Sequence, residues 1–354
     1  MLRAADRYLR ESPITITAST SPRSAGGTHD YFSEGDYWWP DPSHPNGPYV
    51  QRDGMTNPDN FVAHRHALMR LSVHAASLAA AWVLTRKRHY AEHTARHLSA
   101  WFVDEPTRMN PHLLYAQAIH GRVTGRGVGI IDTIHLVEVV RAATVLTKAG
   151  ALSSSLMDRV RQWFNEYLTW MTTHEYGRAE RDATNNHATC WVMQVAEFAN
   201  FTGRSDLSAL CSRRFKDVLV PMQIADDGSF REELRRTKPY GYSLFNLDAM
   251  AAICQILSAR EDNLWTFETP DGRGIRKALA FMVPYIENKK RWPHKPDVMY
   301  YANWPMRHAA LLFGARALRI PAYESLWRRL PADSKVEEVI RNFFIRQPLL
   351  WNTD

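Results

Sequence analysis

The chain has 354 residues, of which 45% are apolar, and it carries a formal net charge of +7 with a pI of about 9.3. This apolar content allows a large core and excludes bulk disorder. Three cysteines are too few for a disulfide framework, and none has the CxxC spacing of a zinc site. The charge favours nucleic acid, an acidic polysaccharide or an anionic membrane surface as partner, but a merely basic surface explains it equally well.

Other features narrow these partners. No dense Lys/Arg run and no RNA- or DNA-binding motif is present, so we expect no nucleic-acid partner. No run of about 18 apolar residues is present, so we expect no membrane partner. The first residues, MLRAADRYLRESP, lack the apolar core of a signal peptide. This predicts a cytoplasmic protein for the sequence as written, or a secreted or periplasmic one if a leader has been trimmed. The oligomeric state stays unknown.

The first sixty residues divide into two parts. Residues 1–11 are predicted to form a short helix. Residues 12–60 are rich in Pro, Gly, Ser, Asp and aromatic residues without clear periodicity, which is typical of a long functional loop. This loop contains DYWWPDP (36–42) and GPYVQRDG (47–54), and its adjacent aromatic residues and prolines predict a rigid platform that contributes to a cleft.

From Asn57 onward the apolar spacing is helical. Asn57 and Pro58 predict the N-cap and first position of a helix that runs to about residue 85. Further helices are predicted at about 89–103, 132–149, 154–175, 187–202, 205–219, 243–260, 272–288, 304–316, 321–330 and 335–346. Alternating segments are scarce, and no repeat of fixed period favours a solenoid. We therefore expect one all-α domain over residues 1–354, an α/α toroid (an incomplete barrel of helical hairpins) with a long N-terminal loop.

The sharpest local motif is DATNNHATCW (182–191), in which polar residues precede an apolar helix. Asn185 or Asn186 can cap the helix, which places His187 in its first turn. There the helix dipole disfavours the imidazolium, so a neutral histidine able to accept a proton is expected. In isolation, a structural cap followed by a partly buried histidine explains the motif better.

A basic loop follows at residues 231–242, REELRRTKPYGY, before another helix. A solvated charge run is its simplest explanation. If the loop faces a cleft, Arg236 can hold a carboxylate, and the nearby cation is expected to lower the pKa of Tyr242.

A third motif spans residues 110–129, NPHLLYAQ followed by HGRVTGRGVG. It lacks the GxxxxGK[ST] spacing and a preceding strand, so nucleotide binding is rejected. Arg122 and Arg126 can instead meet anionic sugars, although loop solvation explains them equally well.

In combination, these motifs resemble the alginate-lyase superfamily of polysaccharide lyases. The resemblance covers about residues 28–315 and rests on DYWWPDP…PYVQRDG…NPDNF, NPHLLYAQ…GRGVGIID, NNHATCW, and EELRRTKPYGYSLFNL…LW…PDGRGI in this order. It implies an α/α toroid and β-elimination on a β-1,4-linked uronic-acid polymer, either alginate (polymannuronate) or glucuronan. An anionic polysaccharide is the implied partner, and no cofactor or metal is expected.

The resemblance also implies the catalytic residues. The family's Asn-His pair matches Asn186 and His187, its arginine matches Arg236, and its tyrosine matches Tyr242. The spacing from arginine to tyrosine is one residue shorter than in the best-known members, which leaves Arg235 as a substitute for Arg236. The residues expected to bind substrate are Trp39, Tyr49, Arg52, Tyr115, Gln117, Arg122, Arg126 and Tyr240, of which Tyr240 is also a second candidate for the catalytic tyrosine.

The chemistry of β-elimination needs these residue types. Removal of the C5 proton of a uronate builds charge on the adjacent carboxylate, which Asn186 can stabilise by hydrogen bonding and Arg236 by charge. A base takes the C5 proton and an acid protonates the departing O4. One tyrosine can do both in a syn elimination, whereas in an anti elimination His187 could be the base and Tyr242 the acid.

Two alternatives stay open at this point. A glycoside hydrolase on the same fold would need two carboxylates across the cleft, and Asp182, Glu232 and Glu233 are available. A non-catalytic protein that binds acidic polysaccharides would bind oligouronates without turnover.

Overall fold

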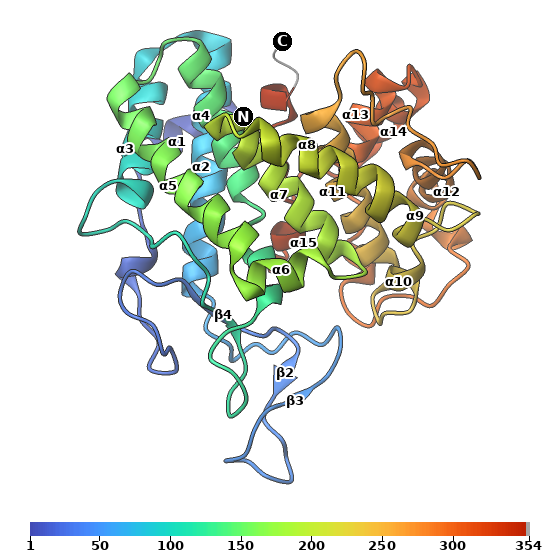
Figure 1. Cartoon of the computed structure of the whole chain (residues 1–354), viewed down its shortest axis with the longest axis horizontal. Coiled ribbons are helices and arrows are strands. Elements are labelled where there is room, and N and C mark those ends of the chain that lie inside the picture. Colours follow the sequence, from blue (N-terminus) through green and yellow to red (C-terminus); the bar gives the residue numbers. More distant parts are fainter. Residues whose placement is uncertain (352–354) are drawn as a thin grey trace.

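The computed structural model describes residues 1–351 and is dominated by helices (Figure 1). The longer helices are α2 (Ala63–Thr85), α3 (Arg88–Phe102), α4 (Leu136–Lys148), α5 (Ser154–Thr173), α7 (Asn186–Thr202), α8 (Ser205–Arg214), α11 (Pro239–Leu257), α12 (Ile275–Glu287), α13 (Ala309–Ala317) and α14 (Pro321–Arg329). The shorter ones are α1 (Leu2–Tyr8), α6 (Glu175–Arg181), α9 (Val220–Gln223), α10 (Arg231–Leu234) and α15 (Glu337–Asn342). The expectation of an all-α protein is confirmed.

The long helices are arranged as hairpins around an inner layer. Helices α2, α4, α7, α11 and α13 contact one another in that order, and α3, α5, α8, α12 and α14 pack outside them. The inner helices are apolar on nearly every face: most residues of α7 and α11 are buried. A helix that is apolar all round must be covered on all sides. This arrangement is the predicted α/α toroid.

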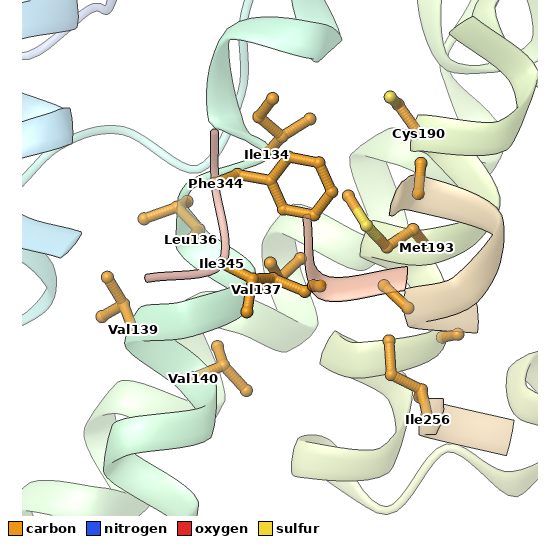
Figure 2. Packing of buried hydrophobic residues seen from close by; sticks show 14 of the residues in the cluster. Ile134, Leu136, Val137, Val139, Val140, Cys190, Met193, Ile256, Phe344 and Ile345 are labelled. Carbon is orange, nitrogen blue, oxygen red and sulfur yellow. The ribbon is translucent and has the colours of Figure 1, made fainter. Parts of the chain in front are cut away.

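The C-terminal segment packs inside this ring. The 3₁₀ helix η6 (Pro348–Trp351) contacts α2 and α4. Phe344 and Ile345 lie in the same buried region as Val137 of α4 and Met193 of α7 (Figure 2). Helix α15 just before them lies near the centre of the molecule (Figure 1). The last part of the chain therefore belongs to the core.

Helix α2 alone, within residues 1–351, is long and apolar enough to cross a membrane by length and composition. However, 78% of its most apolar window is buried inside the protein. Its apolar character thus reflects packing against α3 and α4.

The predicted N-terminal loop is ordered and lies at one end of the helical ring (Figure 1). It contains the strands β1 (Phe32–Glu34), β2 (Trp38–Trp39) and β3 (Val50–Gln51), and β2 pairs antiparallel with β3. Strand β1 pairs in parallel with β4 (Tyr115–Ala118), which comes from the Gly-rich motif. Two segments far apart in the sequence therefore share one end of the molecule.

The start of α2 was predicted wrongly. Helix α2 begins at Ala63, not at Asn57 and Pro58. The Asn57 side chain is buried, and its Nδ2 donates to the carbonyl oxygen of Trp38 at 2.9 Å. Asn57 therefore anchors the loop.

Two short helices were missed, and another helix is interrupted. Helix α6 lies in the expected gap before residue 187, and α10 lies in the basic loop. The helix expected at 205–219 is regular only to Arg214 and continues as a π-helical turn, Phe215–Leu219. Single turns such as α10 carry too little periodicity to be recognised in a sequence.

Candidate active site

A cleft of about 380 Å³ opens between the N-terminal loop and the helical ring. Its lining comes from the loop, from the Gly-rich motif, from the starts of α7 and α11, and from α15. The lining residues are Asp36, Tyr37, Trp38, Gln51, Asp53, Arg65, Gln117, Arg126, Val128, Ile131, Asp132, Ile134, His135, Ala183, Asn185, Asn186, His187, Arg236, Tyr242, Phe245, Arg341 and Asn342.

The start of α7 presents an asparagine and a histidine to this cleft. Asn185 is the N-cap, and its side chain accepts a hydrogen bond from the backbone N–H of His187 at 3.3 Å. This cap satisfies one of the free N–H groups of the first turn. Asn186 is 3% exposed, whereas the His187 side chain is 20% exposed. The histidine is thus reachable from the cleft, and the asparagine lies just beneath its surface.

A buried glutamate orients His187. The Oε1 atom of Glu180, at the end of α6, lies 2.6 Å from Nδ1 of His187, and Glu180 is 1% exposed. A carboxylate only accepts hydrogen bonds, so Nδ1 carries a proton and Nε2 of the neutral ring keeps its lone pair. The second oxygen of Glu180 is buried without a hydrogen-bond partner among residues 1–351. This carboxylate is therefore committed to the histidine.

A second buried glutamate orients Asn186. Glu233 of α10 accepts hydrogen bonds at 2.7 Å from both the backbone N–H and the side-chain Nδ2 of Asn186. Burial raises the pKa of Glu233 to about 7, although the two Asn186 donors and the charge of Arg236 oppose this rise. The amide of Asn186 is thereby fixed, with one Nδ2 hydrogen left for a ligand.

Arg236 is held across the cleft by the N-terminal loop. Its Nη2 and Nε donate to the two carboxylate oxygens of Asp53 at 2.6 and 3.2 Å. Thr237 adds donors to the same carboxylate from its backbone N–H and its hydroxyl. A two-point pair of this kind fixes a guanidinium in direction as well as position. The Arg236 guanidinium also stacks on the Tyr242 ring, 4.7 Å from its centroid.

Tyr242 lies in the first turn of α11 and donates a hydrogen bond to the hydroxyl of Tyr37 at 2.7 Å. The Arg236 Nη2 donates to the Tyr242 oxygen over 3.5 Å. The charge of Arg236 acts to lower the pKa of Tyr242, as expected, but other influences outweigh it. Burial and the neighbouring Tyr37 raise this pKa well above its usual value, and Arg236 only partly offsets them. The raised pKa therefore favours the protonated phenol of Tyr242.

All four residues expected to be catalytic line this one cleft: Asn186, His187, Arg236 and Tyr242. The substitute Arg235 does not. Its side chain is 73% exposed and pairs with Glu232 at 2.6 Å. The basic loop thus directs Arg236, and not Arg235, into the cleft.

The residues expected to bind substrate are more scattered. Gln117 and Arg126 line the cleft, and Arg122 lines a neighbouring hollow of about 530 Å³. The side chains of Trp39, Tyr49, Arg52 and Tyr115 lie on the loop and strand segments beside the cleft but do not line it.

Tyr240 needs a correction. It is 0% exposed, and its hydroxyl donates to the carbonyl oxygen of Tyr285 at 3.1 Å. Its ring packs against Trp292 and Tyr301. Tyr240 is a core residue because, two positions from Tyr242 on α11, it points away from the cleft.

The sequence reasoning missed several residues of the site, among them Tyr37, Trp38 and Asp53 in the cleft lining and Glu180 behind His187. The first three lie inside motifs that had been singled out, so the signal was present but the individual side chains could not be ranked. Glu180 lies at the end of α6, just before the short non-helical link that leads to α7, and nothing in the sequence connects it to His187.

The three carboxylates named as candidates for a hydrolase, Asp182, Glu232 and Glu233, are not free in the cleft. Asp182 pairs with Arg181 and Arg214, and Glu232 pairs with Arg235. Both lie outside the cleft lining. Glu233 is buried and occupied by Asn186. The hydrolase alternative is therefore not favoured.

Comparisons with known proteins agree with this geometry. A family model described as "Alginate lyase" matches residues 15–292. No protein with a curated description matches the chain in sequence.

Solved structures give the same result. An alginate lyase from Bacteroides ovatus is 30% identical, with a TM-score of 0.83, and the match covers 100% of this chain and 92% of that one. Alginate lyase A1-III from a Sphingomonas species is 15% identical with a TM-score of 0.57, over 90% and 86% of the two chains. A histidine variant of A1-III with a bound tetrasaccharide is 14% identical with a TM-score of 0.64, over 100% and 94%. The chain belongs to the alginate lyase family and is a polysaccharide lyase acting on an anionic polysaccharide.

Proposed function

We propose that this lyase cleaves a β-1,4-linked uronan, either polymannuronate in alginate or glucuronan, by β-elimination, and leaves an unsaturated uronate at the new end. The observation that carries the proposal is the convergence of Asn186, His187, Arg236 and Tyr242 on one cleft, each held by a defined partner. The family match and the 30% identical alginate lyase support alginate as the first substrate to test.

The uronate carboxylate is neutralised first in this scheme. The free Nδ2 hydrogen of Asn186 and the guanidinium of Arg236 are the donors for its oxygens. Both are fixed before the substrate arrives, by Glu233 and Asp53 respectively. Donors that are already oriented toward developing charge lower the barrier most, since they need no reorganisation.

The elimination then moves two protons. A base takes the C5 proton, the electron pair of that bond forms the C4–C5 double bond, the C4–O4 bond breaks, and an acid protonates O4. Tyr242 is the acid in this proposal: its phenol oxygen delivers a proton to O4 as the C4–O4 bond breaks.

The substrate's configuration at C5 selects the base. In mannuronate and glucuronate the C5 proton and O4 lie on the same side, so Tyr242 serves as base and acid in turn. Because its pKa is raised, its phenol proton must first pass to an acceptor, and the Nε2 lone pair of His187 in the same cleft fills this role. The phenolate, stacked on the Arg236 guanidinium, then takes the C5 proton and passes it to O4. In guluronate they lie on opposite sides, and the Nε2 lone pair of His187 is the base. For the proposed polymers His187 therefore holds the phenol proton of Tyr242 during the elimination, returns it afterwards, and helps to position the carboxylate.

A substrate panel tests this proposal. Polymannuronate, polyguluronate, glucuronan and hyaluronan are each incubated with the enzyme and followed by ultraviolet absorbance and product size. We expect an absorbance rise with polymannuronate or glucuronan and weaker or no activity on the other two. Binding of these polymers without any absorbance rise would support the non-catalytic alternative and overturn the proposal.

A further inference from the structure

Three arginines at the loop side of the cleft stack on two adjacent tryptophans. Arg122 and Arg126 lie 5.2 and 5.9 Å from the ring centroid of Trp38, and Arg52 lies 5.2 Å from that of Trp39. Both tryptophans belong to β2 and are half-buried. Guanidinium stacking of this kind holds a cation on an aromatic face while leaving its edge free for an anion.

The side-chain hydrogen bonds of Arg122 and Arg126 go to neutral partners, and the charge of Arg52 acts on the carboxylate of Asp41 without an ion pair. Arg126 donates from Nε and Nη2 to the backbone and side-chain oxygens of Gln117 at 2.9 and 3.1 Å. Arg122 donates from Nε to the carbonyl oxygen of Tyr49 at 2.8 Å. Within residues 1–351, no carboxylate lies within 4 Å of Arg52, Arg122 or Arg126. The three side chains are oriented, but their charges are not neutralised.

The support of Arg126 is itself built into the fold. Gln117 has a φ of 51°, in the left-handed region that non-glycine residues rarely adopt, and its Nε2 donates to Asp132 at 3.2 Å. Strain of this kind persists only where surrounding contacts enforce it, and it is common at ligand-binding positions. Burial lowers the pKa of Arg126. Carboxylates that do not contact it, of which Asp132 has the largest influence, raise the pKa by less. The cation is thus under-compensated where it stands.

The cleft and the outer hollow meet at this place. Gln117 and Arg126 line the cleft, and the residues between them, Ala118–Gly125, line the hollow. Arg122 lines the hollow and stacks on Trp38, which lines the cleft. A polymer that leaves the cleft past Trp38 therefore enters a second hollow with another unpaired cation at its wall.

We propose that Arg52, Arg122 and Arg126, on the platform of Trp38 and Trp39, form a carboxylate-binding strip that holds the uronate units next to the reacting one. This inference rests on the proposed function and adds a requirement to it: the substrate must carry carboxylates on neighbouring sugars, not only on the sugar that reacts. A homopolymeric uronan satisfies the strip. A polymer with a uronate at every second sugar leaves part of it empty.

The test compares long and short substrates in variants of the two exposed arginines of the strip. Arg52→Gln and Arg122→Gln are assayed on the uronan that the wild-type enzyme cleaves and on the shortest oligouronate that it cleaves. Each variant is expected to raise KM for the polymer about fivefold, the scale of an exposed ion pair, with kcat nearly unchanged. On the shortest substrate, which does not reach the outer hollow, KM is expected to stay at the wild-type value.

Two controls separate charge from shape and place. Arg122→Lys keeps the charge and is expected to recover most of the polymer KM. Arg213→Gln removes an exposed arginine of α8 that has no ion-pair partner among residues 1–351, and it is expected to leave KM unchanged. Raising the salt concentration should shrink the difference between wild type and Arg122→Gln, because the screening length falls from about 10 Å at 0.1 M to about 3 Å at 1 M.

The outcomes are distinguishable. If the wild-type enzyme cleaves no uronan, the proposed function fails. If it cleaves one but Arg52→Gln and Arg122→Gln keep the wild-type KM on the polymer, or raise KM equally on polymer and shortest oligomer, the strip is overturned and the proposed function stands.

Discussion

The two walls of the cleft handle charge in opposite ways. The helical wall, formed by the starts of α7 and α11 and the basic loop before α11, holds its catalytic side chains with carboxylates: Glu180, Glu233 and Asp53. The loop wall, formed by residues 36–52 and 115–126, holds Arg122 and Arg126 by neutral hydrogen-bond partners and Arg52 by the ring of Trp39, and only Asp53 at its edge reaches over to Arg236. The side chains of the helical wall are paired before substrate arrives, whereas the arginines of the loop wall have no ion-pair partner among residues 1–351.

This difference follows from what each wall must do. A buried carboxylate is costly to desolvate, and its benefit is the fixed direction that it gives to a donor or a histidine. That cost is justified where bonds break, since misplacement by about 1 Å can cost about a hundredfold in rate. An exposed guanidinium costs little and can exchange water for a polymer carboxylate. The helical wall should therefore control kcat, and the loop wall should control KM.

The largest expected effect is the loss of the acid. Tyr242→Phe removes the hydroxyl but keeps the ring on which Arg236 stacks, so the wall should stay intact. We expect kcat to fall at least about a hundredfold, the lower range for a general acid or base, with KM nearly constant. His187→Ala should also abolish the ultraviolet rise. Near-full activity in both variants would refute the site assignment.

A smaller loss is expected when the orientation of His187 is relaxed. Glu180→Gln replaces a pure acceptor by an amide that can also donate, so the ring is no longer held in one tautomer. We expect kcat to fall by about tenfold to about a hundredfold, with the pH profile of kcat altered. The matched control is Glu197→Gln. Glu197 is a buried glutamate of α7 that pairs with Arg141, and neither residue lines the cleft. An equal loss in both variants would mean that the effect is general destabilisation.

The anchor of Arg236 should matter somewhat less. Asp53→Asn keeps the shape of the side chain but weakens the two-point pair, which loosens the guanidinium that faces the substrate carboxylate. We expect kcat/KM to fall about tenfold, mostly through kcat. Asp206→Asn removes the acid of another two-point pair, with Arg204 on α8, and should leave both constants unchanged. A change confined to KM for Asp53→Asn would place Arg236 with the loop wall instead.

The sequence predicted the fold from local patterns, and the family resemblance named the four side chains that the structure brings together in one cleft. Helix periodicity identified most helices, and the cap at Asn185 placed His187 in a first turn. The partners of these side chains could not be predicted in the same way. Glu180, Asp53 and Tyr37 reach the site only through tertiary packing, and Asp53 lies 183 residues from Arg236 in the chain.

The direction of the pKa shift of Tyr242 could not be predicted for a related reason. Its neighbouring cation was visible in the sequence, whereas its burial was not, and burial is the larger influence. The prediction that Tyr240 binds substrate was wrong because the direction of this side chain depends on where α11 begins. The helix begins at Pro239 and not at about residue 243. Both errors concern burial, which a sequence gives only through periodicity.

The final prediction separates the walls by pH. Arginines do not titrate in the working range, so pH should change the helical wall alone. Burial raises the pKa of Glu233 from its ordinary value of 4.5 to about 7. Only the ionised form accepts from both donors of Asn186, so kcat should fall severalfold as pH drops below about 7, while KM for the polymer stays constant. In Glu233→Gln this acid limb should vanish, with kcat low throughout.

The contribution of Glu233 to the free energy of unfolding should fall as pH rises, whereas kcat should rise. Because the folded-state pKa exceeds the unfolded one, the folded chain binds more protons between about pH 4.5 and about pH 7, and Glu233 destabilises the fold increasingly as pH rises through that window. Glu138, buried on α4 away from the cleft lining, has its pKa raised by burial to about 7 and has the same sign. Thermal melts across pH should therefore flatten in both Glu233→Gln and Glu138→Gln, whereas the acid limb of kcat should disappear in Glu233→Gln alone. A kcat limb that persists there would mean that another group in the helical wall governs the activity. A limb lost in both variants would tie it to global stability, and the orientation of Asn186 would not explain it.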